Sequence, residues 1–178
     1  MFIVPQPRPP AHTAAPAFEG RRWPCRLYPG DLSHTSRFRA DLRRDLSELA
    51  GLVIDTADDL VLCASELYAN AVDHSRSGEP DGHVIRTLTM PTADRLRVGV
   101  IDDGHRTNSP HPPMLPEIPR TAPLDGEWAE RGRGLLLIDH LAAAWGSRAV
   151  VGFPFCEGLG TFLWAEFAHT DATVKAVS

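Results

Sequence analysis

The stretch that decides the fold is ELYANAVDHS, residues 66–75. It closes a helix that we predict from about residue 55 to residue 74, because apolar side chains recur there at spacings of three and four residues. These positions are Leu60, Ala64, Leu67 and Ala71. The turn-forming residues 75–82 end the helix. One side of this helix is therefore expected to face a core.

Glu66 and Asn70 stand four residues apart, so their side chains leave the same side of that helix, beside its apolar stripe. An amide oxygen is a hard ligand that suits Mg²⁺, and a carboxylate can act as a base for an attacking hydroxyl group or water molecule. The pair could thus serve a metal-bound triphosphate. An ordinary solvated helix face carries the same spacing, and in isolation the pair favours that interpretation.

Two strand-like runs follow, HVIRTLTM at 83–90 and RLRVGVI at 95–101, and they predict an antiparallel hairpin. Asp102 and Gly104 stand where the second run stops. A carboxylate there can accept a hydrogen bond from an adenine amino group, and a glycine lets the main chain come close to a base. Asp-Gly is also common turn chemistry, so both interpretations stay open at this point.

Residues 104–131 are rich in proline and have no periodicity, which indicates a functional lid or an insert. The closing part of the chain predicts two strands, at 148–153 and 161–168, around the turn CEGLG. Thr161 leads the last strand and could offer its hydroxyl group to a base, although threonine is also simply a good strand residue.

The run GRGLLLIDHLAAAW, residues 132–145, predicts a helix that opens on Gly132 and Gly134. Glycines at a helix start leave N–H groups free to face an anion, and the helix dipole favours a phosphate there. Arg131 and Arg133 would add positive charge. A simple loop-to-helix junction has the same appearance, and a lone GxG is unspecific.

The first part of the chain predicts a short strand within residues 21–28 and a helix that Asp31 or Ser33 caps and Gly51 ends. The order of elements predicts an α+β fold, a two-layer sandwich with the helices on one face of a mixed, largely antiparallel sheet. The predicted boundaries are residues 1–20 for a disordered tail rich in Pro and Ala, 21–168 for the domain and 169–178 for a C-terminal tail.

Composition argues against several classes of protein. The formal net charge of −5 disfavours nucleic acid as a partner, because phosphate contacts need a basic face. Three widely spaced cysteines, Cys25, Cys63 and Cys156, suit a reducing compartment and indicate neither a zinc site nor a disulfide framework. No apolar run approaches the roughly 20 residues that cross a bilayer, and no signal-peptide core is present, so we expect a cytoplasmic protein without membrane contact. No P-loop motif is present.

In this fixed order, the four motifs resemble those of the histidine kinase-like ATPases of the Bergerat fold, also called the GHKL superfamily. ELYANAVDHS is similar to their N-box, VIDDG to their adenine-binding box, RGRGLLLIDHLA to their lid glycine box and GTFLWAEF to their closing threonine strand. The details resemble the bacterial anti-sigma-factor serine kinases over about residues 30–168. The N-box and the lid glycine box are the specific parts.

The resemblance implies an ATP site with Mg²⁺ as cofactor. It implies that Glu66 is the catalytic base and that Asn70 is the Mg²⁺ ligand. It also implies that Asp102 holds the adenine amino group and that Thr161 supports the adenine ring. It further implies that the nucleotide pocket is shaped by Gly104, Gly132 and Gly134, beside which we predict that Arg131 and Arg133 bind the nucleotide through their charge. The partners it implies are an antagonist protein of the anti-anti-sigma type with an acceptor serine, a sigma factor and a second copy of the chain.

Two functions stay open on this basis. The first is a protein-serine kinase and anti-sigma-like switch that uses MgATP, and the presence of Glu66 favours it. The second is a nucleotide-binding adaptor that sequesters a partner without phosphorylating it. Arg106 stands where the family has the second glycine of DxGxG, and the Pro-rich segment that follows is long. Both differences argue against phosphoryl transfer more than against nucleotide binding. The catalytic domain of a sensor kinase is disfavoured, because only about 30 residues precede the ATPase pattern.

Overall fold

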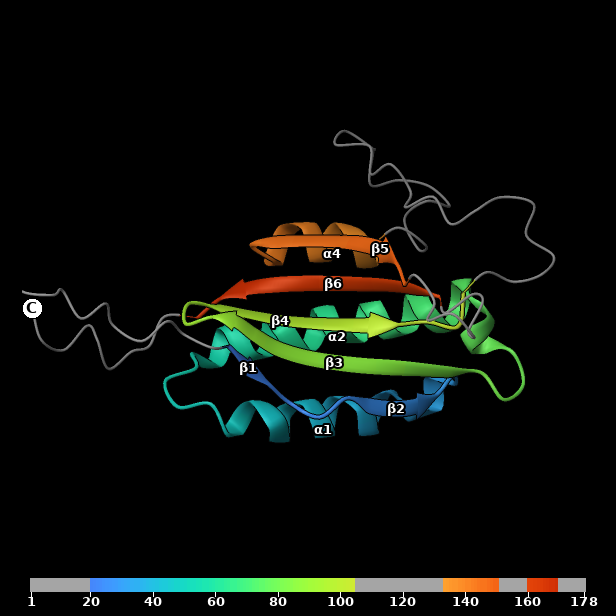
Figure 1. Ribbon diagram of the computed structural model, residues 1–178, viewed down its shortest axis with the longest axis horizontal. Coiled ribbons are helices and arrows are strands. Elements are labelled where there is room, and N and C mark those ends of the chain that lie inside the picture. The colour runs from blue at the N-terminus through green and yellow to red at the C-terminus, as the bar shows by residue number, and fades with distance from the viewer. Residues whose placement is uncertain (1–19, 105–132, 151–159, 170–178) are drawn as a thin grey trace, which may run out of the picture.

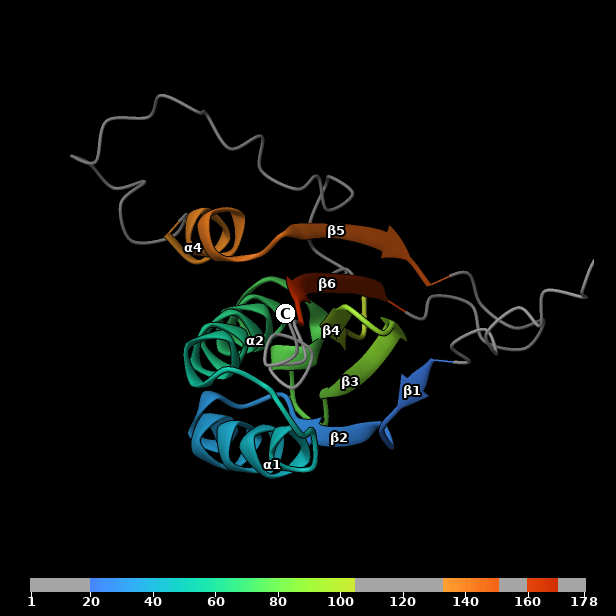
Figure 2. The ribbon, with the colours of Figure 1, turned by 90° about the vertical axis from the view of Figure 1, so that its left-hand side faces the viewer.

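The structure is a computed structural model that describes residues 20–104, 133–150 and 160–169. Within these residues a six-stranded sheet carries its helices on one face, as two perpendicular views show (Figures 1 and 2). The predicted α+β sandwich with a largely antiparallel sheet is confirmed. No helix in the described ranges is long and apolar enough to cross a membrane.

The strands of the sheet follow the order β1-β3-β4-β6-β5, and β2 pairs with β3 beside β1. Their bounds are β1 Arg21–Arg22, β2 Arg26–Pro29, β3 His83–Thr92, β4 Arg95–Ile101, β5 Ala144–Ala149 and β6 Thr161–Ala168. All of these pairings are antiparallel. The predicted hairpin is confirmed as β3 and β4. Because β4 and β6 are neighbours, the end of β4 lies beside the start of β6.

The predicted strand within residues 21–28 is in fact two strands. Pro24 separates them, because its nitrogen has no hydrogen to donate to the ladder. Trp23 still donates its main-chain N–H to the carbonyl oxygen of Leu88, at 3.1 Å, so the connection stays against β3.

In the described ranges, three α-helices cover the sheet: α1 Thr35–Ser47, α2 Ile54–His74 and α4 Arg133–Leu141. The 3-10 turn η1, Leu32–His34, leads into α1, and the Asp31 side chain caps this turn by accepting from the Ser33 N–H at 2.8 Å. The predicted cap at Asp31 is thus present, one turn ahead of the α-helix. A second 3-10 turn, η2, spans Arg76–Gly78 directly after α2.

The core lies between the helices and the sheet. Every second side chain of β3 and β4 points into it, as Val84, Leu88, Val98 and Val100 do, and each is at most 1% exposed. From the helical side, α1 and α2 add fully buried leucines and Phe38. Burial of one such side chain stabilises the fold by about 1.5–3 kcal/mol, so the alternation of the strands and the stripe of α2 together fix how the two layers meet.

The predicted bounds of the helix at 132–145 and of the strand at 148–153 are wrong. The helix expected over residues 132–145 ends at Leu141, and strand β5 already begins at Ala144. The main-chain N–H of Ala142 still donates to Ile138, but that of Ala143 donates to the carbonyl oxygen of Glu166 in β6, at 2.8 Å. Pairing with β6 therefore overrides the helix propensity of three consecutive alanines. The strand expected at 148–153 instead spans Ala144–Ala149, so it begins four residues earlier, and residues 151–153 lie outside the described residues.

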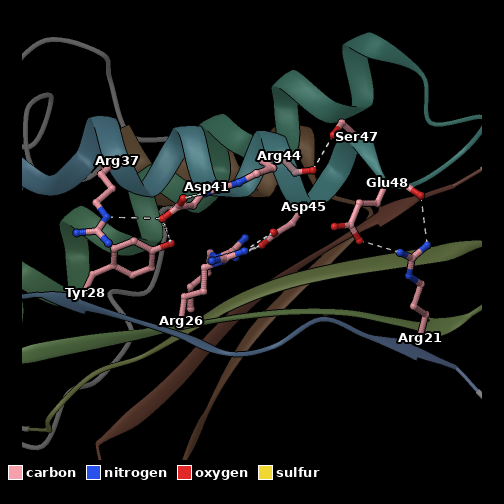
Figure 3. A network of polar contacts seen from close by, with 10 residues as sticks. Arg21, Arg26, Tyr28, Arg37, Asp41, Arg44, Asp45, Ser47 and Glu48 are labelled. Atoms are coloured by element: carbon pink, nitrogen blue, oxygen red, sulfur yellow. Dashed lines mark hydrogen bonds and ion pairs between the residues drawn. The ribbon is translucent and has the colours of Figure 1, made fainter.

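A polar network joins α1 to the sheet side of the core (Figure 3). The Asp45 carboxylate receives two hydrogen bonds from Arg26 of β2, at 2.6 and 3.0 Å, and pairs with Arg86 of β3. One helical turn earlier, Asp41 accepts from the Tyr28 hydroxyl group at 3.3 Å. Arg86 occupies a core position that the alternation of β3 assigns to an apolar side chain, and its partner Asp45 is what allows a charge there.

Candidate functional site

Glu66 and Asn70 lie one turn apart on α2, and both side chains are half-buried. Helix α4 packs against this side of α2, with Gly134 at its first turn. A Cβ atom on Gly134 would fall 2.7 Å from the Glu66 carboxylate oxygen Oε2. The glycine therefore leaves room for the carboxylate at the start of α4, and the structure brings together two residues that are 68 positions apart in the chain.

The Asn70 side chain has an unsatisfied polar atom. Its amide nitrogen Nδ2 is shielded from solvent and has no hydrogen-bond partner within the described part of the chain. Buried polar groups in folded proteins nearly always have partners, so such an atom indicates a position where something else binds or packs. This observation fits a ligand beside Asn70.

Asp102 is held at the junction of β4 and β6. It is 8% exposed, and its oxygen Oδ1 accepts the main-chain N–H groups of Gly104, at 2.8 Å, and of Thr161, at 2.7 Å. The main chain of Asp102 also donates to the carbonyl oxygen of Thr161. Gly104 has a φ of +82°, a conformation that only glycine adopts without strain. The carboxylate therefore has one fixed direction.

Gly160 packs against the same aspartate. A Cβ atom at this position would fall 1.8 Å from the main-chain oxygen of Asp102 and 2.1 Å from its Oδ1. No flexible group could move aside, so this junction requires glycine. The sequence motif contained Gly160, but its contact depends on the pairing of β4 with β6, which sequence spacing does not reveal.

Sequence reasoning also missed the residues that tie the end of α2 to this junction. Arg76 donates from Nε and Nη2 to the carbonyl oxygen of Asp103, at 2.9 and 2.6 Å, and its main-chain N–H donates to Gly104. Figure 1 shows how α2 ends near the end of β4. The two parts of the predicted site, on α2 with α4 and on β4 with β6, thus border the same end of α2. The only sequence signal here was a turn.

Several predicted site residues are not tested by the structure. Arg131 and Gly132 lie outside the described residues, as does the expected lid after Gly104. Arg133 begins α4, and its side chain is likewise outside the description. The phosphate-binding role of this arginine–glycine stretch stays a prediction, as does a role for the Thr161 hydroxyl group.

Cys63, which lies three residues before Glu66 on α2, is not a candidate nucleophile. Burial, with the negative charges of Asp59 and Glu66 added, raises the pKa of the Cys63 thiol to about 12. Since the thiolate is the reactive form, this cysteine is inert near neutral pH.

Comparison with known proteins yields one family. A model of the histidine kinase-like ATPase domain matches residues 28–149, which is more than half of the chain and contains Glu66, Asn70, Asp102 and Gly134. No curated protein matches the chain significantly. Domains of this kind bind ATP, typically with Mg²⁺, which supports an ATP-binding regulatory role. The chain belongs to the family of histidine kinase-like ATPase domains.

Proposed function

We propose that the protein binds MgATP where α2, α4 and the ends of β4 and β6 meet, and transfers the terminal phosphoryl group to a serine of a partner protein. The observation that carries this proposal is the Glu66 carboxylate facing the glycine start of α4, one turn from Asn70, whose amide nitrogen has no hydrogen-bond partner within the described residues and could donate to a phosphate oxygen. A base beside a metal ligand, at the start of a helix, is an arrangement that phosphoryl transfer can use.

Asp102 is the proposed adenine-binding residue. The N–H groups of Gly104 and Thr161 donate to Oδ1 of this carboxylate and so orient it. The adenine amino group would donate to the oriented carboxylate. Because the main chain on either side holds the carboxylate, little ordering remains to be done when the base arrives.

Asn70 is the proposed ligand of the metal. Mg²⁺ is usually held by one or two protein groups together with substrate phosphates and water, rather than by a cage of side chains. In keeping with this, the described residues contain no group of three or more His, Cys, Asp or Glu side chains that could hold a metal ion. When bound, Mg²⁺ neutralises charge on the phosphate oxygens.

Glu66 is the proposed base. Its carboxylate would accept the hydroxyl proton of the acceptor serine while the serine oxygen forms a bond to the terminal phosphorus. The bond from that phosphorus to the bridging oxygen of ADP breaks in the same step. The absence of a side chain at Gly134 leaves Glu66 free to point toward the incoming hydroxyl group.

The identity of the partner is also part of the proposal. The resemblance to the anti-sigma-factor serine kinases supports an antagonist protein of the anti-anti-sigma type as phosphate acceptor. It equally supports a sigma factor as a second partner and a homodimer as the assembly.

The test compares Glu66→Ala and Asn70→Ala with the parent protein, using the protein that the parent retains in the presence of ATP as substrate. Glu66→Ala should keep MgATP affinity and lower phosphoryl transfer by about 10²–10⁴-fold. Asn70→Ala should weaken MgATP binding itself. Glu79→Gln, an exposed carboxyl change after η2, is the control that should leave both quantities unchanged.

Two outcomes would contradict the proposal. If the parent binds MgATP and its partner yet produces no phosphoserine, the protein is an adaptor that sequesters the partner. If transfer occurs and Glu66→Ala leaves its rate unchanged, Glu66 is not the base.

A further inference from the structure

Hydrogen bonds from the turn η2 hold the main chain that follows strand β4. Arg76 donates two side-chain hydrogen bonds to the carbonyl oxygen of Asp103, at 2.9 and 2.6 Å, and a main-chain hydrogen bond to that of Gly104, at 2.8 Å. One residue thus holds two consecutive carbonyl groups. Both come directly after Asp102, the proposed adenine-binding residue.

Ser77, the next residue of η2, also holds this segment. Its hydroxyl group accepts the main-chain N–H of Asp103 at 2.9 Å and donates to the carbonyl oxygen of His83 at 2.6 Å. The main-chain N–H of His83 in turn donates to the Asp103 carboxylate at 2.6 Å. The N–H, carbonyl and carboxylate groups of Asp103 therefore all have partners within η2 and the start of β3.

The turn itself cannot shift easily. Ser77 is fully buried, and a Cβ atom on either of two neighbouring glycines would collide with its carbonyl oxygen, at 1.5 Å for Gly30 and 2.2 Å for Gly82. Gly30 and Gly82 are joined by a main-chain hydrogen bond of 2.8 Å. The hydrogen bonds that hold Asp103 and Gly104 are thus anchored in the packing between β2 and β3.

We propose that Arg76 and Ser77 are positioning residues that set the direction of the Asp102 carboxylate, and so set the preference of the site for adenine over guanine. The inference rests on the proposed ATP site. Fixing the main chain of one residue costs about 1–2 kcal/mol of conformational free energy. In this protein that cost is met during folding, so the segment is already ordered when a nucleotide binds.

Selectivity is the property that separates positioning from a direct contact. If Arg76 contacted the phosphate groups, its removal would weaken the binding of ATP and of GTP equally, because both nucleotides carry the same triphosphate. If Arg76 positions Asp102, its removal weakens the binding of ATP, because the adenine amino group donates to the carboxylate. The binding of GTP then changes little. Guanine presents an oxygen acceptor there instead.

The experiment measures dissociation constants for MgATP and MgGTP on the full chain, well below its melting temperature. The variants are Arg76→Ala, Arg76→Lys and Ser77→Ala, and the control is Arg95→Ala, another half-buried arginine at the far end of β4. Arg76→Ala and Ser77→Ala should each lower the preference for ATP over GTP by about ten-fold. Arg76→Lys keeps one donor and should recover part of that preference.

Amide hydrogen exchange supplies an independent measure without nucleotide. The amides of Asp103 and Gly104 should exchange faster in Arg76→Ala, while those in the middle of β3 stay as protected as in the parent. The inference is overturned if the ATP-to-GTP preference of the Arg76 and Ser77 variants equals that of the parent. If the parent does not bind MgATP, the inference and the proposed function both fail. If the parent binds MgATP but the variants keep its preference, only the inference fails.

Discussion

Asp45 of α1 and Arg86 of β3 form an ion pair inside the core, with their side chains 4% and 0% exposed. Two of the guanidinium nitrogens of Arg86, Nε and Nη1, have no hydrogen-bond partner within the described residues. A buried charge in this position depends strongly on its counter-charge, since the desolvation of either ion alone is costly. The pair therefore makes the packing of α1 on the sheet sensitive to single substitutions.

Removing one member of this pair should cost much more than removing both. Asp45→Asn should lower the free energy of unfolding by about 3–5 kcal/mol, because Arg86 keeps its charge in the core. The double variant Asp45→Leu with Arg86→Met should recover most of this loss, and Arg26 can turn to solvent. Urea titration checks both. Glu48→Gln, which breaks the exposed pair with Arg21, should cost at most about 1 kcal/mol. Equal losses for single and double variants would contradict the argument.

The same carboxylate predicts a dependence of stability on pH. Burial by itself raises the pKa of Asp45, but the hydrogen bonds and charges of Arg26 and Arg86 outweigh burial and hold this pKa below its usual value. Its contribution to stability is thus fully present above the unfolded-chain pKa of about 3.9, and it is lost as the pH falls through the lower folded-state pKa. Unfolding free energies between about pH 6 and pH 2 should fall more steeply for the parent than for the double variant. Parallel curves would show that Asp45 contributes nothing.

MgATP should stabilise the fold, because it binds the folded chain and not the unfolded one. At about 100 times the dissociation constant the gain is about 2.7 kcal/mol, or on the order of 5–10 °C in melting temperature for a chain of this size. Thermal melts at increasing MgATP check this. A melting temperature that stays constant through millimolar MgATP would remove the nucleotide site from consideration.

Asp102→Ala should weaken ATP binding by roughly ten- to a hundred-fold, since loss of a hydrogen bond to a charged group costs about 1.5–3 kcal/mol. GTP binding should change far less, because guanine offers no amino hydrogen at that position. Calorimetric titration of both nucleotides measures the difference. If the parent binds GTP as tightly as ATP, Asp102 is only a turn former at the end of β4.

Two glycine-to-alanine variants should fail in different ways. In Gly160→Ala the new methyl group meets the main chain of Asp102, so both stability and nucleotide affinity should fall. In Gly134→Ala its one contact under 3.0 Å is with the Glu66 oxygen Oε2, at the flexible end of that side chain, so the fold should persist while phosphoryl transfer declines. Melting temperatures and transfer rates, measured on the same samples, distinguish the two. A Gly134→Ala variant with the parent rate would argue against Glu66 as the base.

The sequence predicted those parts of the fold that local periodicity determines. Helix α2 and the β3–β4 hairpin were predicted almost to the residue, because apolar spacing alone distinguishes a helix from a strand. The change from α4 to β5 was not predictable in this way. It depends on the hydrogen bond from Ala143 to Glu166, between residues that only the assembled sheet brings together.

The candidate site shows the same division. Glu66 and Asn70 could be paired from sequence, because residues four apart share a helix face. Gly160 contacts Asp102, and Arg76 donates hydrogen bonds to Asp103. Both contacts join segments that are distant along the chain, so residue spacing in the sequence does not predict them. Arg86 lies at one of the alternate, buried positions of β3, but nothing local in the sequence points to Asp45 as its partner.

The hydrogen bond from the Thr161 N–H to Asp102 spans 59 residues and has a consequence for how the protein is made. Contacts of such long range form slowly, because a large loop must close before they contribute. The hairpin of β3 and β4 can form while the chain is still emerging from the ribosome. The proposed adenine-binding end of the sheet is completed only after β6 has been synthesised, so this end cannot bind a nucleotide while β3 and β4 alone are folded.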